Sequence, residues 1–208
     1  MHADHRTLIH LPLPYYRQHY DFTCGPACLM MAMKYFKKDF NPEKNLEIDL
    51  WRESNLIAVY ATSRYGLAYS AAVRGFSAQV TSNTGGIDFA ERFAPSLNDL
   101  DMELLKNQFH ERRSRCRKMG VWERKETITA TILCKALTSN HVPLIVTNAL
   151  FCSNEDCPHW ITVTGIDDKF MHFNSPSDMR PRKRKIGLPD LPEFIGYHGD
   201  QSMVEVWR

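Results

Sequence analysis

The fold is decided by the segment QHYDFTCGPACLMM, which spans residues 18–31. Its first cysteine, Cys24, stands where an extended, aromatic-rich stretch gives way to an apolar run that is typical of a buried helix. Backbone amides at a helix start point toward such a sulfur, and the helix dipole favours a negative charge there. The pattern therefore predicts a buried helix over residues 24–38 that begins with a reactive thiol.

Two further residues complete a predicted acyl-transfer site around Cys24. Gln18, six residues upstream, can place a side-chain amide beside the sulfur and stabilise an oxyanion. His159 opens the strand-like run HWITVTG, residues 159–165, and can serve as the base. A lone cysteine or histidine is more often an ordinary core residue. The three residues together favour catalysis, because a core gains nothing from a thiol beside an amide donor.

Composition and charge limit the class of protein. The chain has 208 residues, 43% apolar and 24% charged, which is typical of a soluble globular protein. A net charge of +2 gives no argument for a nucleic-acid partner, and the basic run at residues 180–185 is interpreted as a solvated loop. No stretch reaches the roughly 18 apolar residues of a membrane span, and residues 1–6 lack the apolar core of a signal peptide. We therefore expect a cytoplasmic protein without a membrane partner.

The six cysteines are expected to be reduced thiols. They lack the regular spacing of a disulfide framework and stand at positions 24, 28, 116, 134, 152 and 157. Cys152, Cys157 and His159 have an irregular Cys-x4-Cys-x-His spacing that no second ligand pair follows. We therefore expect no metal and no cofactor.

Helical and strand-like patterns fall into two successive blocks. Beyond residues 24–38, helical patterns cover residues 46–55, 66–74, 88–120 and 127–137. Strand patterns cover residues 77–81, 142–147, 159–164, 170–173 and 202–207. Helices first and antiparallel strands second predict an α+β fold. Since no repeat or linker divides the chain, we expect a single domain over residues 1–208.

The motifs around Cys24 and His159 resemble those of the papain-like cysteine peptidases. The matching segments, residues 16–29 and 158–170, carry YRQ, TCGPACL, PHW and GIDDKF. Within that superfamily they are most similar to the bacterial double-glycine peptidases that process bacteriocins, in their stand-alone branch. The resemblance implies a papain-like α+β fold, in which a central nucleophile helix packs on an antiparallel sheet that carries the histidine.

The same resemblance implies a role for each motif residue. Cys24 is the nucleophile, His159 is its base and ion-pair partner, and Gln18 donates to the oxyanion. We expect the sulfur to lie within about 4 Å of a His159 ring nitrogen, with a thiol pKa below the ~8.5 of free cysteine. A thiolate–imidazolium pair then attacks a peptide or amide carbonyl and forms an acyl-enzyme.

Two alternatives to hydrolysis stay open. A catalytically weak or silent relative would serve as a peptide-binding module, and an acyltransferase would pass the same acyl group to an amine. The expected partner in each case is a peptide or peptide-like substrate. The sequence predicts no oligomeric state.

The residue that orients the histidine departs from the family pattern, which ends in an aspartate directly before a proline. The stretch HFNSP, residues 172–176, places Ser175 where the aspartate belongs. Asn174 would face the opposite side of a regular strand, but a one-residue bulge before the proline brings it round. We predict Asn174 as the acceptor for His159, with Ser175 as the alternative and Asp178 as a more distant one.

Overall fold

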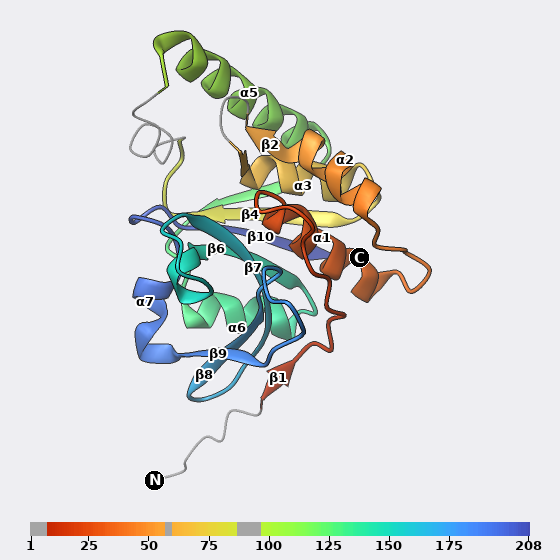
Figure 1. Cartoon of the computed structure of the whole chain (residues 1–208), viewed down its shortest axis with the longest axis vertical. Coiled ribbons are helices and arrows are strands. Elements are labelled where there is room, and N and C mark those ends of the chain that lie inside the picture. Colours follow the sequence, from red (N-terminus) through yellow and green to blue (C-terminus); the bar gives the residue numbers. More distant parts are fainter. Residues whose placement is uncertain (1–7, 57–59, 87–96) are drawn as a thin grey trace.

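The elements of the computed structural model follow the predicted blocks of helices and strands (Figure 1). It describes residues 8–56, 60–86 and 97–208. The helices are α1 (Cys24–Phe36), α2 (Lys44–Ser54), α3 (Arg64–Ala72), α5 (Asp99–Lys118), α6 (Ala130–Thr138) and α7 (Leu191–Phe194), with short 3-10 helices at Ala149–Phe151 and Leu188–Asp190. The strands are β1 (Ile9–His10), β2 (Asn55–Leu56), β3 (Ala61–Thr62), β4 (Ser77–Ser82), β5 (Trp122–Lys125), β6 (Val142–Asn148), β7 (Pro158–Ile166), β8 (Phe170–Asn174), β9 (Arg184–Gly187) and β10 (Ser202–Trp207).

One mixed sheet forms the centre of the molecule. Its strand order is β5-β4-β10-β6-β7-β8-β9, and β1 pairs with the end of β7 that β6 leaves free. Neighbouring strands are antiparallel except β4 and β5, which are parallel and joined through α5. Parallel neighbours need such a crossover. The α+β class is confirmed. The expectation of an all-antiparallel sheet is wrong at one edge, where β5 pairs in parallel with β4.

The predicted helices differ from the observed ones mainly at their ends. The helix expected over residues 88–120 is observed as α5, and the part of that prediction over residues 88–96 lies outside the described residues. Strand β5 was not predicted, because its four residues, WERK, are all exposed and show no apolar alternation. The buried apolar side chains of helices and sheet form one continuous cluster. A single domain over residues 1–208 stays a prediction.

Helix α1 lies in the middle of the molecule. In Figure 1, α2, α3 and α5 gather at one end and β8 and β9 at the other, with α1 between them. Residues Cys24 to Met33 are all buried, because α1 packs on β7 as well as on α2 and α3. Cys28 adds a polar contact by donating its S–H to the Trp160 carbonyl at 3.3 Å. Burial on every side explains why the sequence of this helix is apolar all round.

Helices α2 and α3 meet at Gly66. A Cβ atom on Gly66 would lie 2.5 Å from the Cα and the carbonyl oxygen of Ser54. The Ser63 amide also donates to the Ser54 carbonyl at 2.9 Å, and the Ser63 hydroxyl accepts from the Gly66 amide at 3.1 Å. Because the obstacle is backbone, only glycine allows this approach. The junction fixes the start of α3 and hence the side chains that it contributes to the site.

We expect Gly66→Ala to lower the free energy of unfolding by about 1–3 kcal/mol, because the added methyl group forces the two helices apart. Urea denaturation followed by circular dichroism measures the change. Gly85→Ala is the matched control, since a Cβ there meets nothing within 4 Å. Equal losses in both variants would show that the junction is not tightly packed.

Candidate active site

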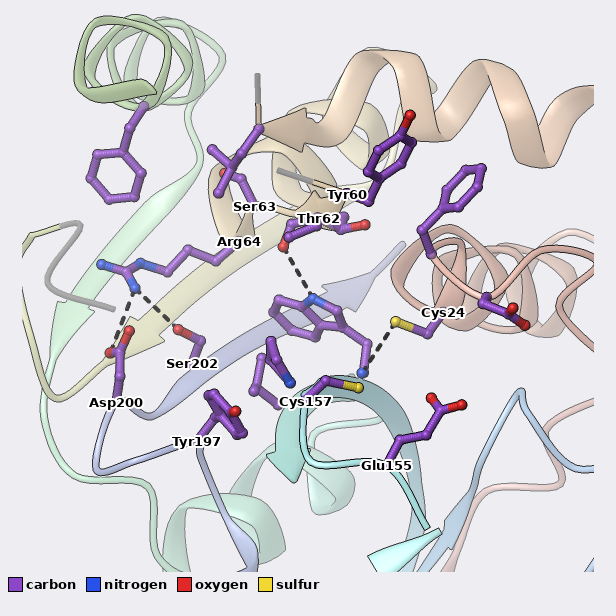
Figure 2. A pocket seen from close by; sticks show the side chains of 18 residues that line it. Cys24, Tyr60, Thr62, Ser63, Arg64, Glu155, Cys157, Tyr197, Asp200 and Ser202 are labelled. Carbon is purple, nitrogen blue, oxygen red and sulfur yellow. Dashed lines mark hydrogen bonds and ion pairs between the residues drawn. The ribbon is translucent and has the colours of Figure 1, made fainter. Parts of the chain in front are cut away.

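The thiol of Cys24 lies at the first residue of α1, in the wall of a cavity (Figure 2). The Cys24 sulfur accepts a hydrogen bond from the Trp160 backbone amide at 3.5 Å. This amide is free to donate, because β8 pairs with β7 only from Thr162 onward and Trp160 lies beyond the end of β8. The amides of Gly25 and of Cys24 itself also favour a charge on the sulfur. The Trp160 N–H therefore lies against the sulfur, and the amides of Gly25 and Cys24 add to its effect on the charge.

Burial dominates the protonation of this site. It raises the pKa of Cys24 to about 11, and the amides of Trp160 and Gly25 offset only part of this effect. Burial also lowers the pKa of His159 to about 4, against the opposing effect of the Asp178 charge. Both groups are therefore neutral near pH 7. The expected low thiol pKa, and with it a resting thiolate–imidazolium pair, is wrong for this structure.

His159 is the second residue of β7 and is only 5% exposed. Its Nε2 lies 3.0 Å from the Ser175 hydroxyl oxygen. Successive side chains point to opposite faces of a strand, so the His159 imidazole and the Trp160 indole point away from each other. The Cys24 thiol contacts the backbone amide of Trp160. Among the hydrogen bonds of the described residues, none joins the Cys24 sulfur to the His159 ring. The expected contact within about 4 Å stays a prediction.

The position beside the imidazole is occupied by Ser175 rather than Asn174. The Ser175 hydroxyl is fully buried and contacts both His159 Nε2, at 3.0 Å, and the Ser177 hydroxyl, at 2.8 Å. The Asn174 amide nitrogen instead lies 3.9 Å from the sulfur of Met31 in α1. The first choice for the residue beside His159, Asn174, is therefore wrong, and the alternative, Ser175, occupies that position.

The bulge that was expected to turn Asn174 toward the histidine occurs elsewhere. The register between β7 and β8 shifts between Val163 and Gly165, within β7. Asn174 remains in the ladder, opposite Thr162, as the last residue of β8. The chain therefore reaches Ser175 in regular alternation, and ungapped matching to the family motif gives the observed neighbour of the imidazole.

Asp178 acts on His159 through its charge. Its buried carboxylate accepts two hydrogen bonds from Arg184, from Nε at 2.7 Å and from Nη2 at 2.6 Å. The negative charge of Asp178 raises the pKa of His159 and the positive charge of Arg184 lowers it. A carboxylate held in this bidentate pair is engaged elsewhere, so Asp178 acts on the ring through its charge and does not replace Ser175 as its hydrogen-bond neighbour.

Gln18 lies in the loop before α1 and is tied to the loop after β8. Its backbone amide donates to the Pro176 carbonyl at 2.9 Å, and its side-chain amide donates to the Tyr20 carbonyl at 2.9 Å. One side-chain N–H is left for another acceptor. Its side-chain oxygen is buried without a hydrogen-bond partner. Gln18 is not among the described residues that line the Cys24 cavity, so its oxyanion role stays a prediction.

A buried carboxylate that sequence analysis missed fixes the segment before Cys24. Glu47 of α2 is fully buried and accepts hydrogen bonds from the Tyr16 hydroxyl, at 2.9 Å, and the His19 backbone amide, at 2.8 Å. It also contacts His19 Nδ1 at 2.7 Å and accepts from the hydroxyl of Thr23, the residue directly before Cys24. No feature of the sequence distinguishes the buried Glu47 from Asp49, an exposed acid on the same helix.

The cavity beside Cys24 has a volume of about 340 Å³ and aromatic walls. Its aromatic side chains are Phe22, Tyr60, Phe109, Trp160 and Tyr197. The cavity has the size and character of a site for a side chain or a short peptide segment. All six cysteines are free thiols, and Cys157 lines the same cavity as Cys24. Within residues 8–56, 60–86 and 97–208, no three metal-ligating side chains cluster and no helix is long and apolar enough to cross a membrane.

Residues 13–192 match the family model described as "Peptidase_C39 like family". The chain belongs to this family. The match includes Cys24 and His159 and confirms the resemblance to the papain-like cysteine peptidases. The crystal structure of a candidate C39-like peptidase from Bacillus anthracis is similar, with a TM-score of 0.55 and 13% identity over 97% of this chain and 98% of that chain. At this identity the likeness shows a shared fold. No curated protein matches the sequence.

We expect alkylation of Cys24 by iodoacetamide to accelerate about tenfold per pH unit between about pH 6 and 9, because the thiolate fraction of a high-pKa thiol grows in this way. Mass spectrometry of the Cys24 peptide measures the rate, with Cys157 as the internal comparison. A rate that is already constant below pH 7 would show that Cys24 rests as a thiolate, against the raised pKa of about 11.

We expect Glu47→Ala to lower the free energy of unfolding by about 3 kcal/mol or more, because several buried donors lose their acceptor together. Chemical denaturation measures the loss. Asp49→Ala is the matched control on the same helix, since its side chain is 58% exposed and pairs with exposed Arg52. The control should change stability by less than about 0.5 kcal/mol. Similar losses in both variants would contradict a structural role for Glu47.

Proposed function

We propose that this protein is a cysteine hydrolase that cleaves peptide or related amide bonds. One observation carries the proposal: the Cys24 thiol sits in a cavity wall at a helix start and accepts a hydrogen bond from the strand that bears His159. Membership of the C39-like family supports the same chemistry. A groove that only binds peptides gains nothing from a thiol surrounded by backbone amides.

The neutral state of both groups decides how the reaction begins. His159 acts as a general base and takes the Cys24 proton while the sulfur attacks the carbonyl carbon. The carbon–sulfur bond forms, and the backbone amides around Cys24 stabilise the oxyanion with the free N–H of Gln18. His159 then protonates the leaving amine, which gives a thioester. Water, activated by the same imidazole, hydrolyses this acyl-enzyme.

Ser175 orients the base in this mechanism. The mechanism requires the tautomer in which His159 Nε2–H donates to the Ser175 hydroxyl, 3.0 Å away, so that Nδ1 is left for the thiol. The Ser175 hydroxyl can then donate to that of Ser177, at 2.8 Å. A neutral hydroxyl fixes the ring without stabilising the imidazolium, unlike the aspartate of the family pattern. The expected result is a working but slow enzyme.

A weak or silent peptide-binding protein is the second candidate. Two observations favour it: burial keeps Cys24 and His159 neutral, and Ser175 supplies no charge to the imidazole. An acyltransferase would use the same thioester and differ only in the acceptor. Peptide or peptide-like substrates are common to all three proposals.

The test is digestion of an acetylated, amidated decapeptide library, with mass spectrometry of the products. We expect cleavage that falls by about a thousandfold or more in Cys24→Ala, because the nucleophile is lost. Cleavage that survives Cys24→Ala would contradict the hydrolase. Binding without cleavage would favour the binding module, and products joined to added glycinamide would favour acyl transfer.

We expect Ser175→Ala to lower kcat/KM about tenfold, because the imidazole loses the partner that orients it. Ser175→Asp should raise the rate at pH 7, since a carboxylate favours the imidazolium. Asn174→Ala is the neighbouring control and should change kcat/KM by less than about twofold. A larger loss in Asn174→Ala than in Ser175→Ala would restore Asn174 as the orienting residue.

A further inference from the structure

A buried arginine lies in the wall of the cavity at the end away from Cys24 (Figure 2). Arg64, the first residue of α3, is only 4% exposed. Its guanidinium lies over the rings of Phe109 and Tyr65, at 5.2 and 5.4 Å from their centroids. A cation removed from water in this way needs acceptors for its five N–H donors.

The guanidinium of Arg64 lacks a full set of acceptors. Nη2 donates to the Gly86 carbonyl at 2.7 Å, and Nη1 donates to the Ser202 hydroxyl at 3.1 Å. Nη1 is also 3.9 Å from the Asp200 carboxylate, which is an ion pair beyond hydrogen-bond length. Nε is buried and has no hydrogen-bond partner. The edge of the guanidinium that includes Nε therefore lacks an acceptor.

Among the residues that the structure describes, the charged groups around this end of the cavity do not satisfy that edge. Asp200 is buried, lies on the Nη1 side, and accepts a hydrogen bond from the Thr84 hydroxyl at 2.9 Å. The other acids that line the cavity, Asp21 and Glu155, are exposed, so solvent screens them. The donor without a partner belongs to the cation, so the missing group is an acceptor.

We propose that this end of the cavity is a subsite for a carboxylate of the substrate, bound by the Nε edge of Arg64. The inference rests on the proposed function, because it states which peptides bind beside Cys24. A carboxylate fits best, since its two coplanar oxygens match a guanidinium edge and its charge strengthens both hydrogen bonds. The carboxylate belongs either to an aspartate or glutamate side chain or to the C-terminus of a short peptide.

Affinity labelling of Cys24 in the full chain tests the subsite without requiring turnover. The probes are iodoacetyl-glutamic acid α-amide and its glutamine counterpart, each also with one glycine spacer to extend the reach. We expect the acidic probe to alkylate Cys24 about tenfold faster than the neutral one, as measured by mass spectrometry. Iodoacetyl-alanine as free acid and as amide makes the same comparison for a C-terminal carboxylate.

Three variants assign the preference to the arginine. In Arg64→Gln the acidic probe should become the slower one, because Asp200 and the acids at the mouth then repel it unopposed. Arg64→Lys keeps the charge without the planar edge and should retain only part of the preference. Arg113→Gln is the matched control, since its guanidinium also lies over the Tyr65 ring, at 5.7 Å, but does not line the cavity.

Equal rates for the acidic and neutral probes in both pairs, in the unaltered protein, would overturn the subsite even if an Arg64 variant fails to fold. An unchanged preference in folded Arg64→Gln would overturn it as well. Loss of the preference in Arg64→Gln with retention in Arg113→Gln supports it. If the acidic probe reacts faster but the protein cleaves no peptide, the result would contradict the hydrolase proposal and still support the carboxylate subsite.

Discussion

The carboxylate of Glu47 has no contact with solvent, and the segment that leads to Cys24 is arranged around it. Removing a charged group from water is unfavourable unless hydrogen bonds replace its hydration. The replacements come from Tyr16, His19 and Thr23, all in that one segment. The path of the chain before α1 is therefore set by a residue of α2. The position of the thiol depends on this constraint, because the residue that precedes Cys24 is one of the donors.

The same exclusion of water sets the chemistry of the thiol. Cys24 and His159 are both neutral, since burial opposes the charged form of each. A neutral, buried thiol is a poor target for oxidants and stray electrophiles, which react with exposed thiolates. In the proposed mechanism, reactivity appears only when a carbonyl group lies against the sulfur and the imidazole accepts the proton. Ser175 fits this arrangement, because a hydroxyl holds the ring without drawing a charge onto it.

Local sequence patterns predicted much of this structure, and the failures have physical causes. The apolar run after Cys24 marks α1 because that helix is buried on all sides. Ser175 rather than Asn174 lies beside the imidazole because β8 runs to Asn174 without the expected bulge. The register shift occurs in β7 instead, and it arises from pairing between strands that no local pattern shows. Glu47 and Arg64 look like ordinary charged helix residues. Only the packing of segments distant in sequence shows that they are buried.

Strand β10 lies inside the sheet, between β4 and β6, although every other strand of the sheet precedes it in the chain (Figure 1). Without β10 the strand order leaves two separate parts of the sheet, β5-β4 and β6-β7-β8-β9, and residues 202–207 join them. Such late closure by distant segments favours slow folding. The same stretch brings Ser202 and the preceding Asp200 to the cavity. The wall of the cavity opposite Cys24 is therefore completed by the last strand of the sheet in chain order, far in sequence from the helix that carries the thiol.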